Sequence, residues 1–588
     1  MKVVFSQKIP KNQPVDYVDF SFGSPIRPTT ANLVPIRPII DARIDIWQSE
    51  INLWHASLIK SLSSIMPDWW RHVGSRLISW HPASFRSLYF ALALSHHLNE
   101  QAPDLIYVLN APDDVRTILQ DLHCDLEIER RENDLWVGII ETLREHVQNK
   151  CLFLLQIFRS FLFANKPIFP DRRSRSASAD IVFSRLLRPQ SRLPSEVPPA
   201  DQYFGRMFDE LSDRSDTQIW IYPASDRKFI NQKATSTSRS VHLATTSLVK
   251  RWQIVAIVIR LFANQITLKK NRKLIPTLCV NGRKLTSFTH RFFQHYFIDS
   301  PTFESFEMEM AVRNLQTHFS IRSAILPYEE KSEMRAALAG LDTSVRTLGF
   351  AHAAHNDGLL YLEHQSSPSP PRPQVIGATG PDAKAFLNTR FSVPASNVQI
   401  IGSPKFIQQS KSEFTHPLNV LFVVSDATEL FAVVDCVVSN ADFFSRIPFG
   451  IKPYPFGYVR KQREAIEMLI RHLPAAKIFS ADLNSATDWA DISVFDSSSA
   501  GIEAILAGNI GLHFKLDQII KRSALCGKSL SSSVTQCVRA EELVKEIARF
   551  QNSSPSELAR IANEQHSSAQ RIFAKPDLRK LAHCLFGT

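Results

Sequence analysis

The sequence lacks the cysteine patterns that hold small folds together through disulfides or zinc. Its seven cysteines are odd in number and scattered, and no two of them form a CxxC pair. A disulfide framework and a zinc ribbon are therefore excluded, and this usage favours a reducing cytoplasm. HExxH and other recognisable metal-ligand spacings are missing too, as is a D-x-D cluster in a plausible loop. The sequence accordingly predicts no metal and no resident cofactor.

Long apolar runs are also missing. The two longest, Ile254 to Phe262 and Leu152 to Phe163, are interrupted by polar or charged residues and fall short of the roughly 20 residues that cross a bilayer. The first residues show no secretory signal, so we expect a cytoplasmic protein. Basic residues beside Leu152 to Phe163 and Leu261 to Lys270 fit a protein peripheral to an anionic inner membrane face. Solvated charge on ordinary helices is the alternative.

The composition describes a large soluble protein with excess positive charge. Hydrophobic residues make up 44% and charged residues 21% of the 588 residues, which suits a globular chain of about three or four structural units. The formal charge of +11 admits nucleic acid, an anionic membrane or an anionic substrate as partner. RNP-like motifs, helix-turn-helix signatures and zinc fingers are absent from the sequence, so we expect no nucleic-acid partner.

Strand-like and helix-like segments alternate along the first two thirds of the chain. Residues 1–95 read as a helical N-terminal extension. The buried-strand pattern of Asp104 to Asn110 then opens a first α/β domain, predicted at residues 96–365. Pro167 to Ala200, rich in Arg, Ser and Pro, reads as a loop. Further strands are predicted at Gln218 to Tyr222, Ser323 to Pro327 and Thr347 to Ala351.

A proline-rich linker at residues 366–373, SSPSPPRP, separates this domain from a second one, predicted at residues 374–539. Residues 540–588 read as C-terminal helices that return to brace the first lobe. The pattern predicts an α/β fold of two Rossmann-like lobes with mostly parallel sheets, the arrangement called GT-B. The strands of the second lobe are expected at Gln374 to Ile376, Val398 to Ile401, Val420 to Val424, Phe449 to Lys452, Ile492 to Phe495 and Ile510 to Phe514.

The segment Asp491 to Phe514 is the most informative in the chain. It reads as a strand, a turn with three serines, a short helix and a second strand with few spare residues. The start of a helix leaves backbone N–H groups unpaired and carries partial positive charge, so it can hold a phosphate. Ser498 and Ser499 are the predicted phosphate ligands, and Glu503 can accept hydrogen bonds from ribose hydroxyls. An ordinary βαβ unit, with the serines only capping the helix, is the alternative.

Several segments, in their order along the chain, resemble bacterial surface-carbohydrate (capsule, O-antigen or lipopolysaccharide) biosynthesis proteins of GT-B type. These proteins are loosely akin to sialyl-, polysialyl- and Kdo-transferases. The matching segments are LPYEEKSEMRAAL and TLGFAHAAH in the first lobe, then VIGATG, IIGSPKF, the KPYP that begins at Lys452, and SSAGIEA. The resemblance covers about residues 320–515. It implies a glycosyltransferase that takes a nucleotide sugar, with a CMP-linked acidic sugar as the best guess.

The resemblance also implies where the donor and the catalytic groups lie. On the donor side it points to Lys452, Gly402 and Ser403, and Lys405 meets either a phosphate or solvent. Tyr454 stands where related proteins have a histidine that contacts the donor phosphate. A tyrosine hydroxyl donates one hydrogen bond but does not become a cation near neutral pH. The base that takes the proton of the acceptor hydroxyl is expected among His352, His355, Asp357 and Glu330.

Inverting transfer without a metal, to a surface polysaccharide or a lipid-linked acceptor, is the predicted reaction. A CDP-polyol phosphotransferase of the teichoic-acid type is one alternative, because it shares the GT-B body and uses histidines at similar positions. A catalytically silent scaffold of a polysaccharide assembly complex is another, because Tyr454 replaces the expected histidine. Glu329, Glu330 and Glu333 also have a simpler explanation as solvated acids at a helix start.

Overall fold

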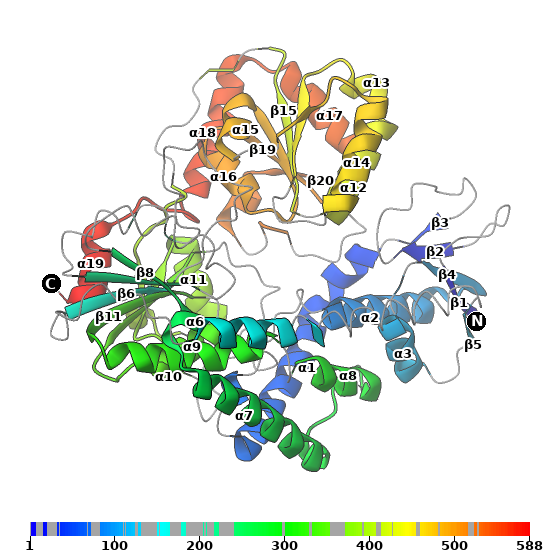
Figure 1. The fold of residues 1–588 in the computed structure, drawn as a ribbon. Helices are drawn as coiled ribbons and strands as arrows, with labels where there is room; N and C mark the ends of the chain where they lie inside the picture. Colours follow the sequence, from blue (N-terminus) through cyan, green and yellow to red (C-terminus); the bar gives the residue numbers. More distant parts are fainter. Residues whose placement is uncertain are drawn as a thin grey trace.

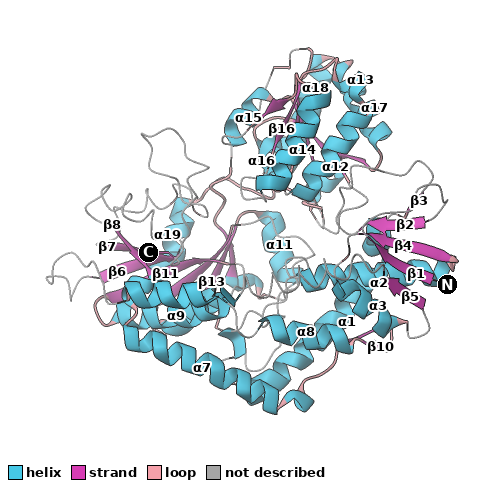
Figure 2. Ribbon diagram, turned by 45° about the vertical axis from the view of Figure 1, so that its right-hand side comes forward, coloured by secondary structure: helices cyan, strands magenta, loops and turns pink. Residues whose placement is uncertain are grey.

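The computed structural model contains three parallel sheets, each covered by helices (Figure 1). It describes residues 2–6, 16–19, 32–34, 36–66, 69–71, 83–109, 111, 113–123, 127–130, 150–151, 153–164, 178–183, 204, 207, 217–222, 240–296, 300–328, 332–352, 371–390, 393–406, 413–414, 416–425, 427–453, 459–479, 483–515, 523–525 and 528–587. In Figure 2 the three groups of strands stand apart as separate sheets.

The first sheet lies in the N-terminal unit and has the order β3-β2-β4-β1-β5, with every pairing parallel. Its strands are β1 (Lys2–Ser6), β2 (Asp16–Asp19), β3 (Asn32–Leu33), β4 (Leu105–Leu109) and β5 (Glu127–Arg130). The prediction of a helical extension followed by a new domain at residue 96 is therefore wrong. The strand β4 pairs with β1, about a hundred residues earlier, so it belongs to the N-terminal sheet.

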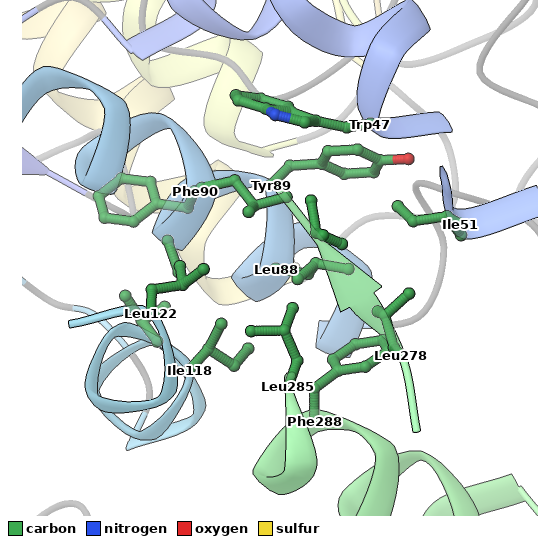
Figure 3. Close-up of a cluster of buried hydrophobic side chains, with 14 of the residues drawn as sticks. Trp47, Ile51, Leu88, Tyr89, Phe90, Ile118, Leu122, Leu278, Leu285 and Phe288 are labelled. Carbon is green, nitrogen blue, oxygen red and sulfur yellow. The ribbon is translucent and has the colours of Figure 1, made fainter. Parts of the chain in front are cut away.

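Long helices complete this unit: α1 (Ile36–Ile65), α2 (Ala83–Gln101) and α3 (Asp113–Leu122). Helical spacing places Trp47 and Ile51 of α1 in a core with Leu88 and Tyr89 of α2. Figure 3 shows this core closed from below by Phe288 and its neighbours. They come from a much later segment, the β9–β10 hairpin (Cys279–Val280, Arg283–Lys284) and α8 (Thr286–Tyr296).

The second sheet has seven parallel strands in the order β14-β13-β12-β11-β6-β7-β8. They are β6 (Ser178–Phe183), β7 (Thr217–Tyr222), β8 (Ser240–Ala244), β11 (Ser320–Pro327), β12 (Arg346–Ala351), β13 (Val375–Ala378) and β14 (Val398–Ile400). The strand β6 lies inside the segment predicted as a loop. Its side chains alternate between two cores: Ile181 and Phe183 face one and Val182 faces the other.

The position of β13 corrects a second prediction. Residues 374–376 and 398–401 were expected to open the second lobe, but β13 pairs with β12 and β14 pairs with β13. The change from one sheet to the next therefore falls between Ile400 and Val420, after the proline-rich segment. Helices on this sheet are α6 (Thr245–Leu248), α7 (Arg251–Lys270), α9 (Ser300–Gln316), α10 (Ser332–Gly340) and α11 (Pro381–Arg390). A helical segment at 153–163 packs into the same core as α7 and α9.

The third sheet has six parallel strands in the order β17-β16-β15-β18-β19-β20. They are β15 (Val420–Val423), β16 (Phe449–Lys452), β17 (Lys477–Ile478), β18 (Ile492–Phe495), β19 (Ile510–Phe514) and β20 (Thr535–Cys537). Helices cover both faces, as the largely apolar central strands predict. They are α12 (Ala427–Ser439), α13 (Ala441–Phe444), α14 (Val459–His472), α15 (Leu483–Trp489), α16 (Ala500–Leu506), α17 (Ala540–Gln551) and α18 (Pro555–Ala569).

The C-terminal end of the chain crosses back to the second sheet, as predicted. After α18 the chain follows the ends of β13 and β14, where Ala574 N–H donates to the Thr379 carbonyl and Asp577 N–H donates to the Ile401 carbonyl. The last helix, α19 (Leu578–Phe586), then buries Leu581 and Leu585 against β11 and β12. In Figure 1 this helix, in red, stands beside the strands of the seven-stranded sheet.

The fold class is α/β with parallel sheets, and the second and third sheets form two Rossmann-like lobes. The N-terminal unit with its own sheet is an addition to the two lobes. The cysteines that the structure describes, Cys151, Cys279, Cys436, Cys537 and Cys584, are all free thiols. Helices long and apolar enough to span a bilayer were not found among the described residues.

Candidate functional site

The segment predicted as strand, serine turn, helix and strand has that structure. β18 ends at Phe495, α16 begins at Ala500, and β19 pairs with β18 in parallel. The helix turns sharply off the strand because position 501 is glycine. A Cβ atom there would lie 2.1 Å from the Phe495 ring. The turn therefore sits at the C-terminal edge of the third sheet, where ligands of parallel α/β sheets collect.

The three serines of the turn have different roles. The Ser497 hydroxyl lies 2.7 Å from that of Ser425, in the turn after β15. The buried Ser498 hydroxyl accepts the Ala500 N–H at 3.3 Å. Ser499 occupies the N-cap position, but its side chain makes no capping hydrogen bond. Capping therefore does not account for Ser499, which is half-buried.

A buried carboxylate joins the serine turn to the neighbouring strand end. Glu429, in the first turn of α12, is 1% exposed. It accepts the Ser497 N–H at 3.2 Å and also the Ser425 N–H. Hydrogen bonds to a charged acceptor are stronger than neutral ones, so Glu429 holds the turns after β15 and β18 in one arrangement. Glu429 was not among the predicted site residues, because its sequence shows only an acidic residue in the first turn of a helix.

A second buried network supports the turn from the side of β19. His513 Nε2 lies 3.2 Å from Asp496 Oδ1 and 2.8 Å from the Ser523 hydroxyl. Asp496 and His513 are both almost fully buried at the ends of β18 and β19. The Asp496 carbonyl also accepts the Ala524 N–H at 3.0 Å. These contacts fix the strand ends beneath the serines, and their burial gives them a positioning role.

An ion pair connects the serine turn to the other lobe. Lys405 follows β14 in the seven-stranded sheet, and its Nζ lies 2.6 Å from Glu503 Oε1 in α16. Both side chains are about three quarters shielded from solvent, with 28% and 23% exposed. The Lys405 ammonium also lies 5.4 Å from the centre of the Phe573 ring. Phe573 belongs to residues 570–577, which connect α18 to α19 and are called the crossing segment below. This contact places the C-terminal edge of the second sheet directly against the candidate site.

Gly402 and Ser403, predicted to face a donor, lie against the crossing segment. Gly402 has φ +82°, and a Cβ atom there would lie 2.2 Å from the Lys575 carbonyl oxygen. Ser403 is fully buried, and its N–H donates to the Ala574 carbonyl at 2.9 Å. These residues therefore hold the two lobes in contact, and direct donor binding by them stays a prediction.

Asp382 is a second residue between the lobes that was not predicted. It lies in the first turn of α11 and accepts the Ser529 N–H at 2.9 Å and the Ser529 hydroxyl at 2.6 Å. Its other oxygen accepts from Arg571 Nε at 3.2 Å. Both partners belong to the third sheet's side of the molecule. The position of Asp382 in the sequence showed only a helix-start acid, which gives no sign of a distant partner.

Of the predicted acid–base residues, only His352 lies in the described part of the chain. It follows directly after β12 at the C-terminal edge of the second sheet and is half-buried, and its ring centre lies 6.4 Å from that of Phe350. On one side of β12 the next strand is β13, and beyond it lies β14, which leads to Gly402 and Lys405. The other candidates, Glu330, His355, Asp357 and the donor-side Tyr454, lie outside the described residues.

Lys452 lies at the end of β16 and is 7% exposed. Its ammonium donates to the Pro453 carbonyl at 3.2 Å, and its carbonyl accepts the Val424 N–H. It therefore brings positive charge to the same strand edge as the serine turn, two strands away. Within the described residues, His, Cys, Asp and Glu nowhere gather in threes that could hold a metal ion.

Protein-family models do not match this chain, and curated protein sequences show no significant similarity to it. The structure is similar to that of UDP-GlcNAc 2-epimerase from Neisseria meningitidis bound to UDP-GlcNAc, with TM-score 0.40 and 10% identity, covering 69% of this chain and 99% of that one. It is also similar to MurG of Acinetobacter baumannii (TM-score 0.37, 11% identity, 70% and 100% covered) and to TarM of S. aureus (0.36, 7%, 69% and 98%).

Proposed function

We propose that this chain is a glycosyltransferase that moves a sugar from a nucleotide-activated donor to a surface polysaccharide or a lipid-linked acceptor. The observation that carries the proposal is the contact between Lys405 and Glu503. It sets the C-terminal strand edge of one parallel sheet against the serine turn of the other. A ligand bound at Ser499 would therefore have both lobes beside it, as a reaction between a donor and an acceptor requires.

The donor side of the proposal rests on the serine turn. The first N–H groups of α16 already donate to oxygens of Ser498 and Ser499. The Ser499 hydroxyl and the positive end of the helix dipole are therefore the features suited to a diphosphate or a phosphate. The buried partners Glu429 and Asp496 keep this turn fixed, so little ordering is needed when a ligand binds. Glu503 is the proposed ribose acceptor. A carboxylate has about four lone-pair sites, so it can hold Lys405 and a ribose hydroxyl together.

The acceptor side rests on the edge that carries His352. A glycosyl transfer with inversion needs a base for the acceptor hydroxyl and positive charge for the departing phosphate. His352 is the proposed base, and Glu330, His355 and Asp357 are kept as candidates from the sequence. Lys452 and Lys405 are the proposed sources of positive charge, so the transfer needs no metal. A CMP-linked acidic sugar is the proposed donor, on the sequence resemblance alone.

Product analysis tests this proposal. The protein is incubated with CMP-, UDP- and GDP-sugars and with a CDP-polyol, each with an oligosaccharide acceptor. Released nucleotide is measured by chromatography, and the product by mass spectrometry and ³¹P NMR. We expect nucleotide release from a sugar donor and an acceptor that has gained a sugar without phosphorus. A product with a phosphodiester signal would show a polyol phosphotransferase instead. Absence of turnover with every donor would favour a scaffold.

A further inference from the structure

Large apolar side chains are exposed on one part of the molecule far more than elsewhere. Among the described residues, 15 large hydrophobic side chains are exposed, and 11 of them lie in two segments, 153–163 and 250–274. Scattered exposed apolar residues are normal, but a concentrated set marks an interaction surface. On α7 the exposed ones are Trp252 (65%), Val255 (49%), Ile259 (64%), Phe262 (53%) and Ile266 (54%).

These five side chains form one stripe along α7. Their spacing of three and four residues returns to the same face of a helix at each turn, over about 21 Å of helix length. A different face of α7 holds the helix to the protein, because Ile254, Ile257 and Leu261 are buried in the core beneath it. The helix is therefore apolar both toward the core and toward solvent, which folding of the chain alone does not explain.

The helical segment at 153–163 extends this apolar surface. It exposes Leu154, Leu155, Phe158, Phe161 and Leu162, each by 40% or more. It meets the start of α7, where the Arg251 guanidinium lies 5.5 Å from the centre of the Phe161 ring. The apolar surface thus involves two neighbouring helices. A single partner helix would cover only the narrow stripe on α7. An apolar surface that spans two helices therefore favours a broader partner.

The charge around the stripe has one sign. Residues 250–273 include seven Lys or Arg residues and neither Asp nor Glu, and all seven basic residues are exposed. Six of them flank the stripe at its ends, with Lys250 and Arg251 before it and Lys269, Lys270, Arg272 and Lys273 after it. A second copy of this face would bring like charges together. An anionic lipid surface complements both the apolar stripe and the cations.

We infer that α7, with the segment 153–163, is the face on which this protein lies against an anionic membrane. The side chains of the stripe enter the headgroup boundary, and the flanking lysines and arginines contact the lipid phosphates. Trp252 is the first residue of the stripe, next to Lys250 and Arg251, and Trp rings favour the membrane–water interface. This inference does not depend on the reaction that the protein catalyses.

Vesicle flotation tests the inference. Wild-type protein is mixed with vesicles of phosphatidylcholine, either alone or with about 30% phosphatidylglycerol, at about 0.1 M salt. We expect binding to the anionic vesicles to be at least about tenfold stronger than to the neutral ones, and to weaken at higher salt. The double variant Ile259→Glu/Phe262→Glu should bind the anionic vesicles about tenfold more weakly than wild type, or weaker still, because two apolar groups no longer enter the lipid.

Two further variants make the result specific. Ile470→Glu carries the same change at an exposed position (44%) of α14 in the other lobe, and it should bind like wild type. Lys269→Glu/Lys270→Glu keeps the stripe and should lose only the preference for anionic vesicles. Thermal unfolding confirms that each variant is folded.

Flotation of Ile259→Glu/Phe262→Glu equal to wild type, or no flotation of wild type, would overturn the inference. A dimer that this variant breaks, without flotation of wild type, would assign the face to a second copy.

Discussion

Replacing Gly402 with valine is expected to destabilise the contact between the two lobes by about 4 kcal/mol or more, among the largest effects of single substitutions. The φ of +82° alone makes any side chain costly, by about 1–2 kcal/mol. In addition, a Cβ atom would lie 2.2 Å from the Lys575 carbonyl oxygen and 2.6 Å from Pro576 Cα. Both are backbone atoms, which cannot move aside as the end of a side chain can.

The matched control for this prediction is Gly282→Val. Gly282 has a similar φ of +74° in the β9–β10 hairpin, but nothing lies within 4 Å of the position its Cβ would take. It should therefore show the conformational cost of about 1–2 kcal/mol and nothing more. Thermal unfolding measures the loss of stability, and limited proteolysis with peptide mapping follows exposure of residues 570–578. Equal effects of the two substitutions would show that the crossing segment does not press on Gly402.

Glu307→Gln is expected to change how stability depends on pH. Glu307 of α9 is fully buried, and its Oε2 lies 3.5 Å from the Thr245 hydroxyl. Its pKa is raised to about 8, chiefly by burial; the nearby Ser160 hydroxyl lowers this pKa, the Glu304 carboxylate raises it and the Thr245 hydroxyl lowers it. The side chain is thus neutral in the folded protein at pH 7, while the unfolded chain ionises it at its ordinary pKa of 4.5.

The sign of the effect follows from proton binding. Between pH 4.5 and about 8 the folded protein holds a proton at Glu307 that the unfolded chain has lost, so rising pH favours unfolding. The loss accumulates to about 4 kcal/mol at pH 8. Glutamine does not titrate, but its amide introduces a buried donor that costs about 1–3 kcal/mol if unpaired. The variant should therefore unfold at a higher temperature than wild type at pH 8 and at an equal or lower one at pH 5.

Melting temperatures of both proteins from pH 5 to 9 measure this difference. The difference between variant and wild type should grow steadily between pH 5 and 8 and level off above that range. Glu541→Gln, an exposed acid in the first turn of α17, serves as the control and should leave the pH profile of wild type unchanged in this range. Parallel profiles for Glu307→Gln and wild type would mean that Glu307 has no raised pKa.

Sequence patterns predicted those parts of the fold that local chemistry determines. The strand at Val420 to Val424 is a continuous apolar run and appears as β15, and Ile510 to Phe514, apolar except for His513, appears as β19. The strand β6 was missed because only Ile181, Val182 and Phe183 form its apolar run, between Ser- and Arg-rich stretches. The sheet to which a strand belongs depends on pairing with distant residues, so β4 and β13 were placed in the wrong units.

The candidate site likewise has features that local sequence predicts and features that depend on distant residues. The turn around Ser499 could be predicted because strand, serines, helix and strand follow one another within 24 residues. The contact between Lys405 and Glu503 joins residues 98 positions apart, and that of Asp382 with Arg571 joins residues 189 apart. Neither pair has a local signal in the sequence. The roles of Gly402 and Ser403 likewise depend on the crossing segment, whose path only the structure shows.

Nucleotide binding at the serine turn is the central claim, and thermal shift measures it most directly. A ligand that binds only the folded protein raises its melting temperature. We expect at least one of CMP, CDP, UDP and GDP to stabilise wild type, and Glu503→Ala and Ser499→Pro to bind that nucleotide about tenfold more weakly. Glu564→Ala, at an exposed glutamate of α18, should show the full shift. Absence of a shift with every nucleotide, or an equal shift in Glu503→Ala and wild type, would contradict the account.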